Sequence, residues 1–317
     1  MMYIKFWGTR GSIPTPITSA AIKQKFRRAL EGAAGLNLFD PVVIDRYLER
    51  LPFPVQHTVG GNTTCLEVRS GDQLLILDAG SGLRALGWDL MKKGFANGTG
   101  RADFLFTHTH WDHIQGFPFF TPAFVPGNHF TFYSPFAELA ERLERQQDPA
   151  FFPVPVSVMS ATLDFKQINP EEEHRIGNFR VKAMRLSHPG VTYGYRIEDD
   201  NACLVMATDS EYKRVSPEST RDFENFFKDA DLLIFDAQYS FGEALDKLDW
   251  GHSTAMMGAE FAHRAKAKRL ALFHHDPNSS DEQIWQAKEQ ADAYLMSRRA
   301  NPLSQVLVAY DGLCVEI

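Results

Sequence analysis

The hexapeptide His108-Thr109-His110-Trp111-Asp112-His113 constrains this chain more than any other stretch of its sequence. It follows the apolar run Phe104-Leu105-Phe106, which predicts a buried strand ending just before it. Residues two apart on a strand lie on the same side, so the first two histidines are expected to point together. The aspartate and the last histidine follow where the chain turns. Three imidazoles and a carboxylate suit a borderline-soft divalent cation such as zinc, and the motif therefore predicts a metal site.

Three further candidate ligands stand directly after apolar or β-branched runs, where strands are expected to end. They are His188 after the run 179–184, Asp209 after the run 203–206, and His274 after the run 270–273. With the hexapeptide they make seven candidate ligands, five histidines and two aspartates. Such side chains, far apart in the chain but all placed at strand ends, can converge on one edge of a sheet.

The hexapeptide resembles the His-x-His-x-Asp-His signature of the metallo-β-lactamase superfamily, a set of dinuclear metal hydrolases. The downstream order His, Asp, His is also similar to that family's, and the matches extend from the first strand to nearly the last residue. The resemblance implies an α/β fold, a four-layer αββα sandwich of two mixed β-sheets. The strand pattern alone indicates only an α/β chain with many strands, in which meanders followed by helices recur in both halves.

The resemblance also implies how the ligands divide between two divalent metal ions. One ion is assigned to His108, His110 and His188, the other to Asp112, His113 and His274, with Asp209 bridging. Zinc is the expected metal, with manganese or iron as alternatives. Two cations roughly 3.5–4 Å apart repel each other strongly unless anions lie between them. The bridging carboxylate and a bridging hydroxide would supply those anions.

The charge of such a site favours a phosphodiester substrate. Two dications, less Asp112, Asp209 and one hydroxide, leave one surplus positive charge that a phosphodiester would neutralise. The expected reaction is hydrolysis of a small or cyclic phosphodiester by the metal-bridging hydroxide, which Asp112 orients. A carboxylic ester, lactone or thioester is neutral and gains less from the surplus, and hydrolysis of these substrates is the alternative.

A proton donor for the leaving group is expected from the stretch Trp250–Thr254. It resembles the His-Ser-Thr segment of the ribonuclease Z and cyclic-phosphodiesterase branches of the superfamily, in which the histidine faces the scissile phosphate. Ser253 and Thr254 can cap the following helix, so a phosphate would meet His252 and a helix N-terminus together. The alternative is a plain helix cap beside an exposed histidine.

Other residues are expected around the site. An aspartate at the position of Asp78 supports a metal-binding histidine in the family, although an ordinary turn aspartate is equally consistent with the sequence. Arg10 either pairs with a phosphate or forms a structural ion pair. Strand alternation turns His275 away from His274, which leaves it behind the metal site or against the substrate. Six phenylalanines either stack on a base or belong to the core, namely Phe117, Phe119, Phe120, Phe124, Phe151 and Phe152.

Charge and composition narrow the partners. The net charge of −7 provides no basic field for a long nucleic acid, which with the lack of a Gly/Pro-rich arm disfavours ribonuclease Z itself. No stretch approaches a membrane helix in length, and the start has too short an apolar run for a signal peptide. A cytoplasmic protein with a small-molecule substrate and no membrane contact is expected, its oligomeric state open, a homodimer included. Cys65, Cys203 and Cys314 are expected to be buried free thiols.

One domain is expected over residues 1–317, because no repeat, linker or low-complexity tract divides the chain. Residues 16–58 have the character of a helical insertion. Ala20–Leu30 and Val42–Leu51 have helical patterns, and Pro52-Phe53-Pro54 is expected to end them.

Overall fold

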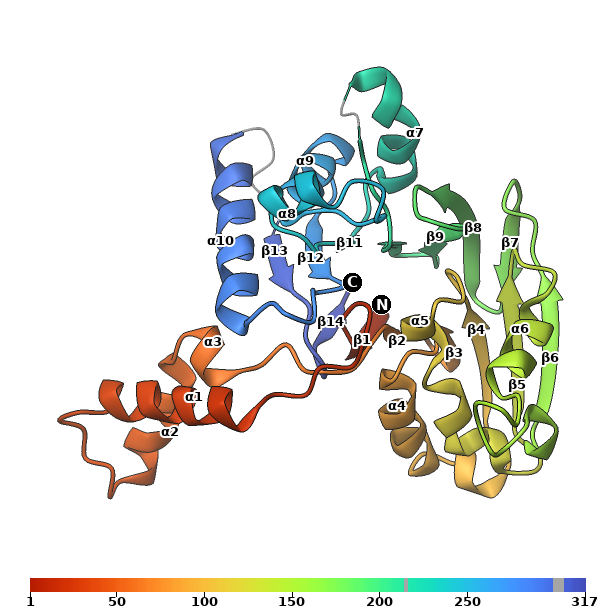
Figure 1. The fold of residues 1–317 in the computed structure, drawn as a ribbon, viewed down its shortest axis with the longest axis horizontal. Coiled ribbons are helices and arrows are strands. Elements are labelled where there is room, and N and C mark those ends of the chain that lie inside the picture. The colour runs from red at the N-terminus through yellow and green to blue at the C-terminus, as the bar shows by residue number, and fades with distance from the viewer. Residues whose placement is uncertain (214–215, 299–304) are drawn as a thin grey trace.

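The computed structural model describes residues 1–213, 216–298 and 305–317 and contains two mixed β-sheets packed face to face (Figure 1). Within these residues each sheet has seven strands, and helices lie on the outer faces. The expected four-layer αββα sandwich is confirmed. The strands formed where β-branched and apolar residues alternate or run together, as the sequence predicts.

The first sheet has the strand order β14-β1-β2-β3-β4-β5-β6. Its strands are β1 (Met2–Gly8), β2 (Cys65–Ser70), β3 (Gln73–Leu77), β4 (Arg101–Leu105), β5 (His129–Ser134), β6 (Thr162–Gln167) and β14 (Cys314–Glu316). Pairing is antiparallel from β14 to β3 and parallel from β3 to β6. The carboxyl ends of β3 and β4 therefore lie at one edge.

The second sheet has the order β13-β12-β11-β10-β9-β8-β7. Its strands are β7 (Glu173–Ile176), β8 (Phe179–Leu186), β9 (Thr192–Glu198), β10 (Cys203–Ala207), β11 (Leu232–Asp236), β12 (Arg269–Phe273) and β13 (Gln305–Val308). Strands β10 to β13 are parallel, and β8 runs the same way because two antiparallel pairings separate it from β10. Strands β8, β10, β11 and β12 thus also end at a common edge.

Helices cover both sheets. Those beside the first sheet are α4 (Gly82–Met91), α5 (Trp111–Ile114) and α6 (Leu139–Gln146), with the short helices η1 (Phe95–Asn97), η2 (Phe117–Phe119), η3 (Thr121–Phe124) and η4 (Val156–Val158). Those beside the second sheet are α7 (Pro217–Phe227), α8 (Phe241–Asp246), α9 (Ala255–Ala265) and α10 (Asp281–Ser297). No described helix is both long and apolar enough to cross a membrane.

The core between the sheets joins residues from both halves of the chain. Phe6 and Leu105 of the first sheet pack in one cluster with Ile197 and Met206 of the second. Tyr195 is fully buried there, and its hydroxyl donates a hydrogen bond to the carbonyl of Phe106 at 2.6 Å. This bond spans the two sheets next to the segment that carries the hexapeptide, because Phe106 directly follows β4.

The helices of residues 16–58 extend from the body of the molecule (Figure 1). They are α1 (Ser19–Gly32), α2 (Pro41–Arg50) and α3 (Phe53–Gln56). Neither α1 nor α2 contains a buried residue, and Lys25 ties α1 to the start of α10 through an ion pair with Asp281 at 2.7 Å. The prediction that Pro52-Phe53-Pro54 ends the helices was incomplete, since a proline is tolerated in a first helical turn and α3 begins there.

One strand is not evident from the sequence, and one further expectation needs correction. Strand β7 was not predicted, because its residues Glu173–Ile176 are mostly polar and it pairs only with β8 at the sheet edge. Cys65 and Cys203 are buried, but Cys314 is exposed, and its sulfur lies 2.9 Å from the hydroxyl of Tyr3. Cys314 belongs to β14, an edge strand, whose side chains can face solvent.

Candidate metal centre

The candidate ligands gather where strands from both sheets end. Asp78, Asp209 and His274 follow β3, β10 and β12, and the hexapeptide follows β4. A cleft of about 550 Å³ opens there, lined by Ser12, Thr109, His110, Trp111, Asp112, His188, Asp209 and His252. The carboxyl ends of parallel strands are where α/β proteins commonly bind ligands.

One group of donors consists of His108, His110 and His188, whose donor atoms lie within 4.8 Å of one another. The ring centroids of His108 and His110 are 4.4 Å apart, and His188 Nε2 lies 3.1 Å from His110 Nδ1. The two hexapeptide histidines do come together, but β4 ends at Leu105. They therefore lie in the loop beyond the strand, and strand alternation is not what aligns them.

A second group consists of Asp112, His113, Asp209 and His274, all buried and again within 4.8 Å. His274 Nε2 lies 3.1 Å from Asp112 Oδ2 and 3.4 Å from His113 Nε2. Asp112 and His113 reach this position because the chain turns into α5 directly after His110.

The Asp209 carboxylate lies between the two groups. Its Oδ2 is 3.3 Å from His113 Nε2, and its Oδ1 is 3.3 Å from His274 Nε2 and 3.9 Å from His108 Nε2. The structure thus brings all seven predicted ligands together, in the two sets that the resemblance implies, with Asp209 central.

The donor set fits divalent cations. His108 Nε2 is buried and has no hydrogen-bond partner among the described residues, which is costly for a polar atom unless something binds it. Burial lowers the pKa values of His108, His110 and His188, His108 well below its ordinary value, so these rings are neutral and offer lone pairs. A neutral imidazole is the form that coordinates a metal.

The second group carries a strong demand for positive charge. Burial opposes the charged form of His274, but the carboxylates of Asp209 and Asp112 outweigh it and raise its pKa to about 9. The pKa of His113 is likewise raised well above its usual value by Asp209 and Asp112, against the effect of burial. Without another cation, two imidazolium rings must balance the buried carboxylates, and a divalent ion would supply the same charge.

Hydrogen bonds behind the rings fix which nitrogen faces the cleft. His113 Nδ1 donates to Asp78 Oδ2 at 2.8 Å, and His274 Nδ1 donates to Gln238 Oε1 at 2.8 Å. His188 Nδ1 donates to the carbonyl of Gly251 at 2.9 Å. Nε2 of each ring is left for a ligand, which is the arrangement that supporting residues give to metal-binding histidines. Asp78 therefore contacts one of the candidate ligand histidines, as the resemblance implies.

Three residues that follow strand ends at the site adopt left-handed backbone conformations. The φ angles are +59° at Asp78, +58° at Asp209 and +59° at His274. Each follows a strand end, and the left-handed turn swings the side chain out of the strand direction and toward the cleft. Asp and His populate this region more than most non-glycine residues do. Such strain persists only where the surrounding contacts hold it, and it is common at functional sites.

His252 lies at the cleft beside both groups. Its ring centroid is 5.0 Å from that of His274 and 5.1 Å from that of His188. Its Nδ1 donates to Asp236 Oδ2 at 2.8 Å, so Nε2 is the nitrogen left without that bond. The predicted helix N-terminus does not accompany it. Thr254 caps α9 by accepting from Met257 N, but Thr254 and Ala255 line a different cavity.

Asp236 is a supporting residue that the sequence analysis missed. It is fully buried at the end of β11, and Oδ2 accepts hydrogen bonds from His252 Nδ1 and from the Asp209 backbone N–H at 3.0 Å. Its Oδ1 accepts from the backbone N–H groups of Gln238 at 3.1 Å and Ser253 at 3.2 Å. One carboxylate thereby fixes both Asp209 and His252. Its position directly after a buried strand, like that of Asp78, is the signal that could have indicated it.

Arg10 has a structural role. Its guanidinium donates to three carbonyls, those of Gly60 at 3.0 Å, Asp276 at 2.8 Å and Ser279 at 3.0 Å, and the side chain is buried. The expectation that it pairs with a phosphate is therefore wrong, and the bonds join loops rather than forming an ion pair. The same N-terminal loop does border the site, because Ser12 N donates to Asp112 Oδ2 at 2.7 Å.

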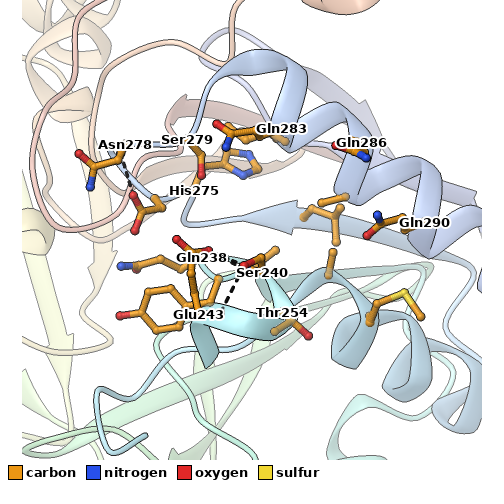
Figure 2. Close-up of a pocket in the computed structure, with 18 residues that line it drawn as sticks. Gln238, Ser240, Glu243, Thr254, His275, Asn278, Ser279, Gln283, Gln286 and Gln290 are labelled. Atoms are coloured by element: carbon orange, nitrogen blue, oxygen red, sulfur yellow. Dashed lines mark hydrogen bonds between the residues drawn. The ribbon is translucent and has the colours of Figure 1, made fainter. Parts of the chain in front are cut away.

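His275 points away from the metal centre and into a separate cavity of about 510 Å³. Its Nε2 donates to the carbonyl of Ala309 at 2.9 Å, and burial lowers its pKa to about 3. Figure 2 shows this cavity, in which Gln283, Gln286 and Gln290 of α10 face Ser240, Glu243 and Thr254. His275 contacts none of the predicted ligands there, so the expectation that it supports the metal site or meets the substrate is not supported.

Comparison with known proteins gives one family and several relatives. A family model described as Beta-lactamase superfamily domain matches residues 75–275. A Ribonuclease Z of Nitrosopumilus maritimus (strain SCM1) is 28% identical over 145 residues, which are 40% of this chain and 48% of that protein. The chain thus spans less than half the length of that relative.

Solved structures resemble this chain over its whole length. The metallo-beta-lactamase fold protein YhfI from Bacillus subtilis has a TM-score of 0.64 at 18% identity and covers 100% of this chain and 99% of its own. Unliganded yeast PDE1 has a TM-score of 0.66 at 12% identity, with the same coverage of 100% and 99%. At such identities these likenesses show the fold.

Proposed function

Because this chain belongs to the beta-lactamase superfamily, we propose that it is a metal-dependent hydrolase of small or cyclic phosphodiesters. The observation that carries the proposal is the convergence of seven donors, the central Asp209 carboxylate among them, with His252 at the same cleft. The likeness to a protein named Ribonuclease Z supports phosphodiester chemistry over the hydrolysis of carboxylic esters, lactones or thioesters.

Two divalent cations, zinc by preference, would be held by the two donor groups, with Asp209 shared between them. When bound, such ions supply a nucleophile at neutral pH and stabilise negative charge on the phosphoryl oxygens. Asp112 and Asp209 cancel only part of the charge of two dications. The remaining positive charge suits an anionic diester better than a neutral ester or lactam.

We assign to His252 the role of donating a proton to the leaving group. Its Nδ1 is held by the buried Asp236 carboxylate, which pairs with the ring when it is positively charged. Its Nε2 can then carry the proton that the departing oxygen requires. The stacking against His274 places the ring beside the centre, because the two planes are only 20° apart. Asp112, fixed by the Ser12 N–H, orients the attacking group.

The purified protein is expected to bind close to two equivalents of divalent metal and to hydrolyse bis(p-nitrophenyl) phosphate. Metal analysis after dialysis and release of p-nitrophenolate measure the two properties. Chelation should abolish turnover, and added zinc or manganese should restore it. Inertness toward the diester, together with turnover of a lactone or thioester, would contradict the phosphodiesterase assignment but not the hydrolase class.

His252→Ala is expected to retain its metal and to lose about 100- to 1,000-fold in kcat, the range typical of a missing general acid. The variant also tests whether His252 is a proton donor or a metal ligand. The second role is open to it because its donor atom lies close enough to those of Asp209 and His274 to share a metal ion. Loss of one metal equivalent would make His252 a ligand instead of a proton donor. His174→Ala, whose histidine bonds to the carbonyl of Asn169 away from the cleft, is the matched control and should behave like the wild type.

A further inference from the structure

A second cleft, of about 720 Å³, opens beside the metal centre. Thr109 and Trp111 line both clefts, so the two spaces adjoin within the hexapeptide loop. This size falls in the range of about 300–1,000 Å³ that is usual for small-molecule sites. A substrate held at the metal centre can therefore extend into this second cleft.

Large aromatic side chains lie exposed along this cleft. Trp111 is 82% exposed, Phe119 52% and Phe151 80%, and we call these three residues the aromatic wall. The ring of Phe152 meets that of Phe119 edge to face, with centroids 5.4 Å apart. Exposed aromatic residues gathered on one surface indicate a binding site, and flat rings suit a flat ligand.

Not all phenylalanines of the predicted cluster reach this cleft. Phe117 and Phe120 are fully buried and pack in the core between the first sheet and its helices. Only the phenylalanines around Phe119 and Phe151 remain available to a ligand.

Two arginines of α6 line the same cleft. Arg142 Nη1 donates to Thr109 Oγ1 at 3.0 Å, which places its guanidinium at the boundary between the two clefts. The acidic side chain that pairs with it, Glu138, is 3.8 Å away and solvent-exposed, so the charge of Arg142 is weakly compensated. Arg145 is exposed, and no ion pair within the described ranges includes it. In a chain of net charge −7, this local positive charge suits the phosphates of a ligand.

We propose that the second cleft is a nucleobase subsite, and that the substrate is a nucleotide phosphodiester whose base stacks on the aromatic wall. Arg142 and Arg145 lie against its anionic backbone, and the scissile phosphate reaches the metal centre past Thr109. The substrate assignment rests on the proposed phosphodiesterase function. A purely apolar occupant would leave the two arginines unused, and a sugar phosphate would leave the aromatic wall exposed.

Binding of adenosine 5′-monophosphate and of ribose 5-phosphate, in which a hydroxyl group replaces the base, tests the subsite by calorimetry. The wild type is expected to bind the nucleotide about tenfold more tightly or better, as stacking on aromatic side chains predicts. Phe151→Ala should remove most of that ratio. Trp88→Ala removes another exposed aromatic residue, on α4 outside the cleft, and should preserve the ratio. Equal affinity for the two ligands, or a ratio unchanged in Phe151→Ala, would overturn the proposal.

Kinetics separate this proposal from the one on which it rests. Thymidine 5′-(p-nitrophenyl phosphate) and methyl p-nitrophenyl phosphate share the diester charge and the leaving group, but only the first has a base. The ratio of their kcat/KM values is expected to be about tenfold or more and to fall in Phe151→Ala. Equal turnover of the two esters would contradict the base subsite but leave the phosphodiesterase function intact. Turnover of neither ester would remove the phosphodiesterase function and the subsite with it.

Discussion

Asp209→Asn is expected to lower kcat for phosphodiester hydrolysis about a thousandfold and to reduce bound metal to one equivalent or less. The Asp209 carboxylate faces His108 on one side and His113 and His274 on the other. Asparagine keeps the size of the side chain and tolerates the left-handed backbone at this position. Only the negative charge shared by the two donor groups is lost.

The control for this variant is Asp229→Asn. Asp229 also has a positive φ, +52°, but it is exposed and outside the cleft. The same chemical change in the same backbone conformation should therefore leave metal content and turnover at wild-type values. Two metal equivalents and near-normal kcat in Asp209→Asn would mean that this carboxylate is not shared between two ions. Metal analysis and kcat measured on one preparation decide the matter.

Asp236→Ala is expected to reduce the free energy of unfolding by about 3–5 kcal/mol, because several buried N–H groups lose their acceptor at once. The carboxylate accepts from the backbone of Asp209, Gln238 and Ser253 and from the ring of His252. Activity should fall further than in His252→Ala, since Asp209 is released as well. Urea denaturation and kcat measure the two effects.

Asp236→Asn provides the graded comparison. The asparagine oxygen can still accept from the backbone N–H groups of Gln238 and Ser253. The new NH₂ group then faces the N–H groups of Asp209 and His252, which lose their acceptor. An intermediate loss of stability is expected, with a larger loss of activity because the charge beside His252 is gone. Asp236→Ala within about 1 kcal/mol of the wild type would show that water replaces the carboxylate without penalty.

Much of the fold could be predicted because its strands are apolar runs bounded by turns. Strands Gln73–Leu77 and Gln305–Val308 are examples, since each is short, largely apolar and flanked by turn or helix signals. Strand β7 and helix α3 were missed for physical reasons. The polar residues of β7 form a strand because they pair with β8 at the sheet edge. This pairing cannot be seen in the local sequence pattern.

The site was predictable where residue type alone carries the information. The hexapeptide is dense in ligand-type side chains, and the family resemblance indicates which downstream histidines and aspartate join it, so the seven candidate donors could be named from the sequence. Asp236 could have been suspected from its place after a buried strand, although only the fold shows that it contacts His252. Gln238 could not be named, because a glutamine gains its role only from the ring that it contacts. Arg10 illustrates the converse, since its chemistry suited a phosphate while the fold directs it to carbonyls.

The donors come from both sheets, and this has a consequence for how the protein acquires its chemistry. The hexapeptide belongs to the first half of the chain, whereas His188, Asp209 and His274 belong to the second. If these donors hold metal as proposed, neither half could assemble a complete set of ligands alone. Bound ions would then cross-link the two halves of the chain, and a chain whose halves had not yet docked would bind no metal and have no activity.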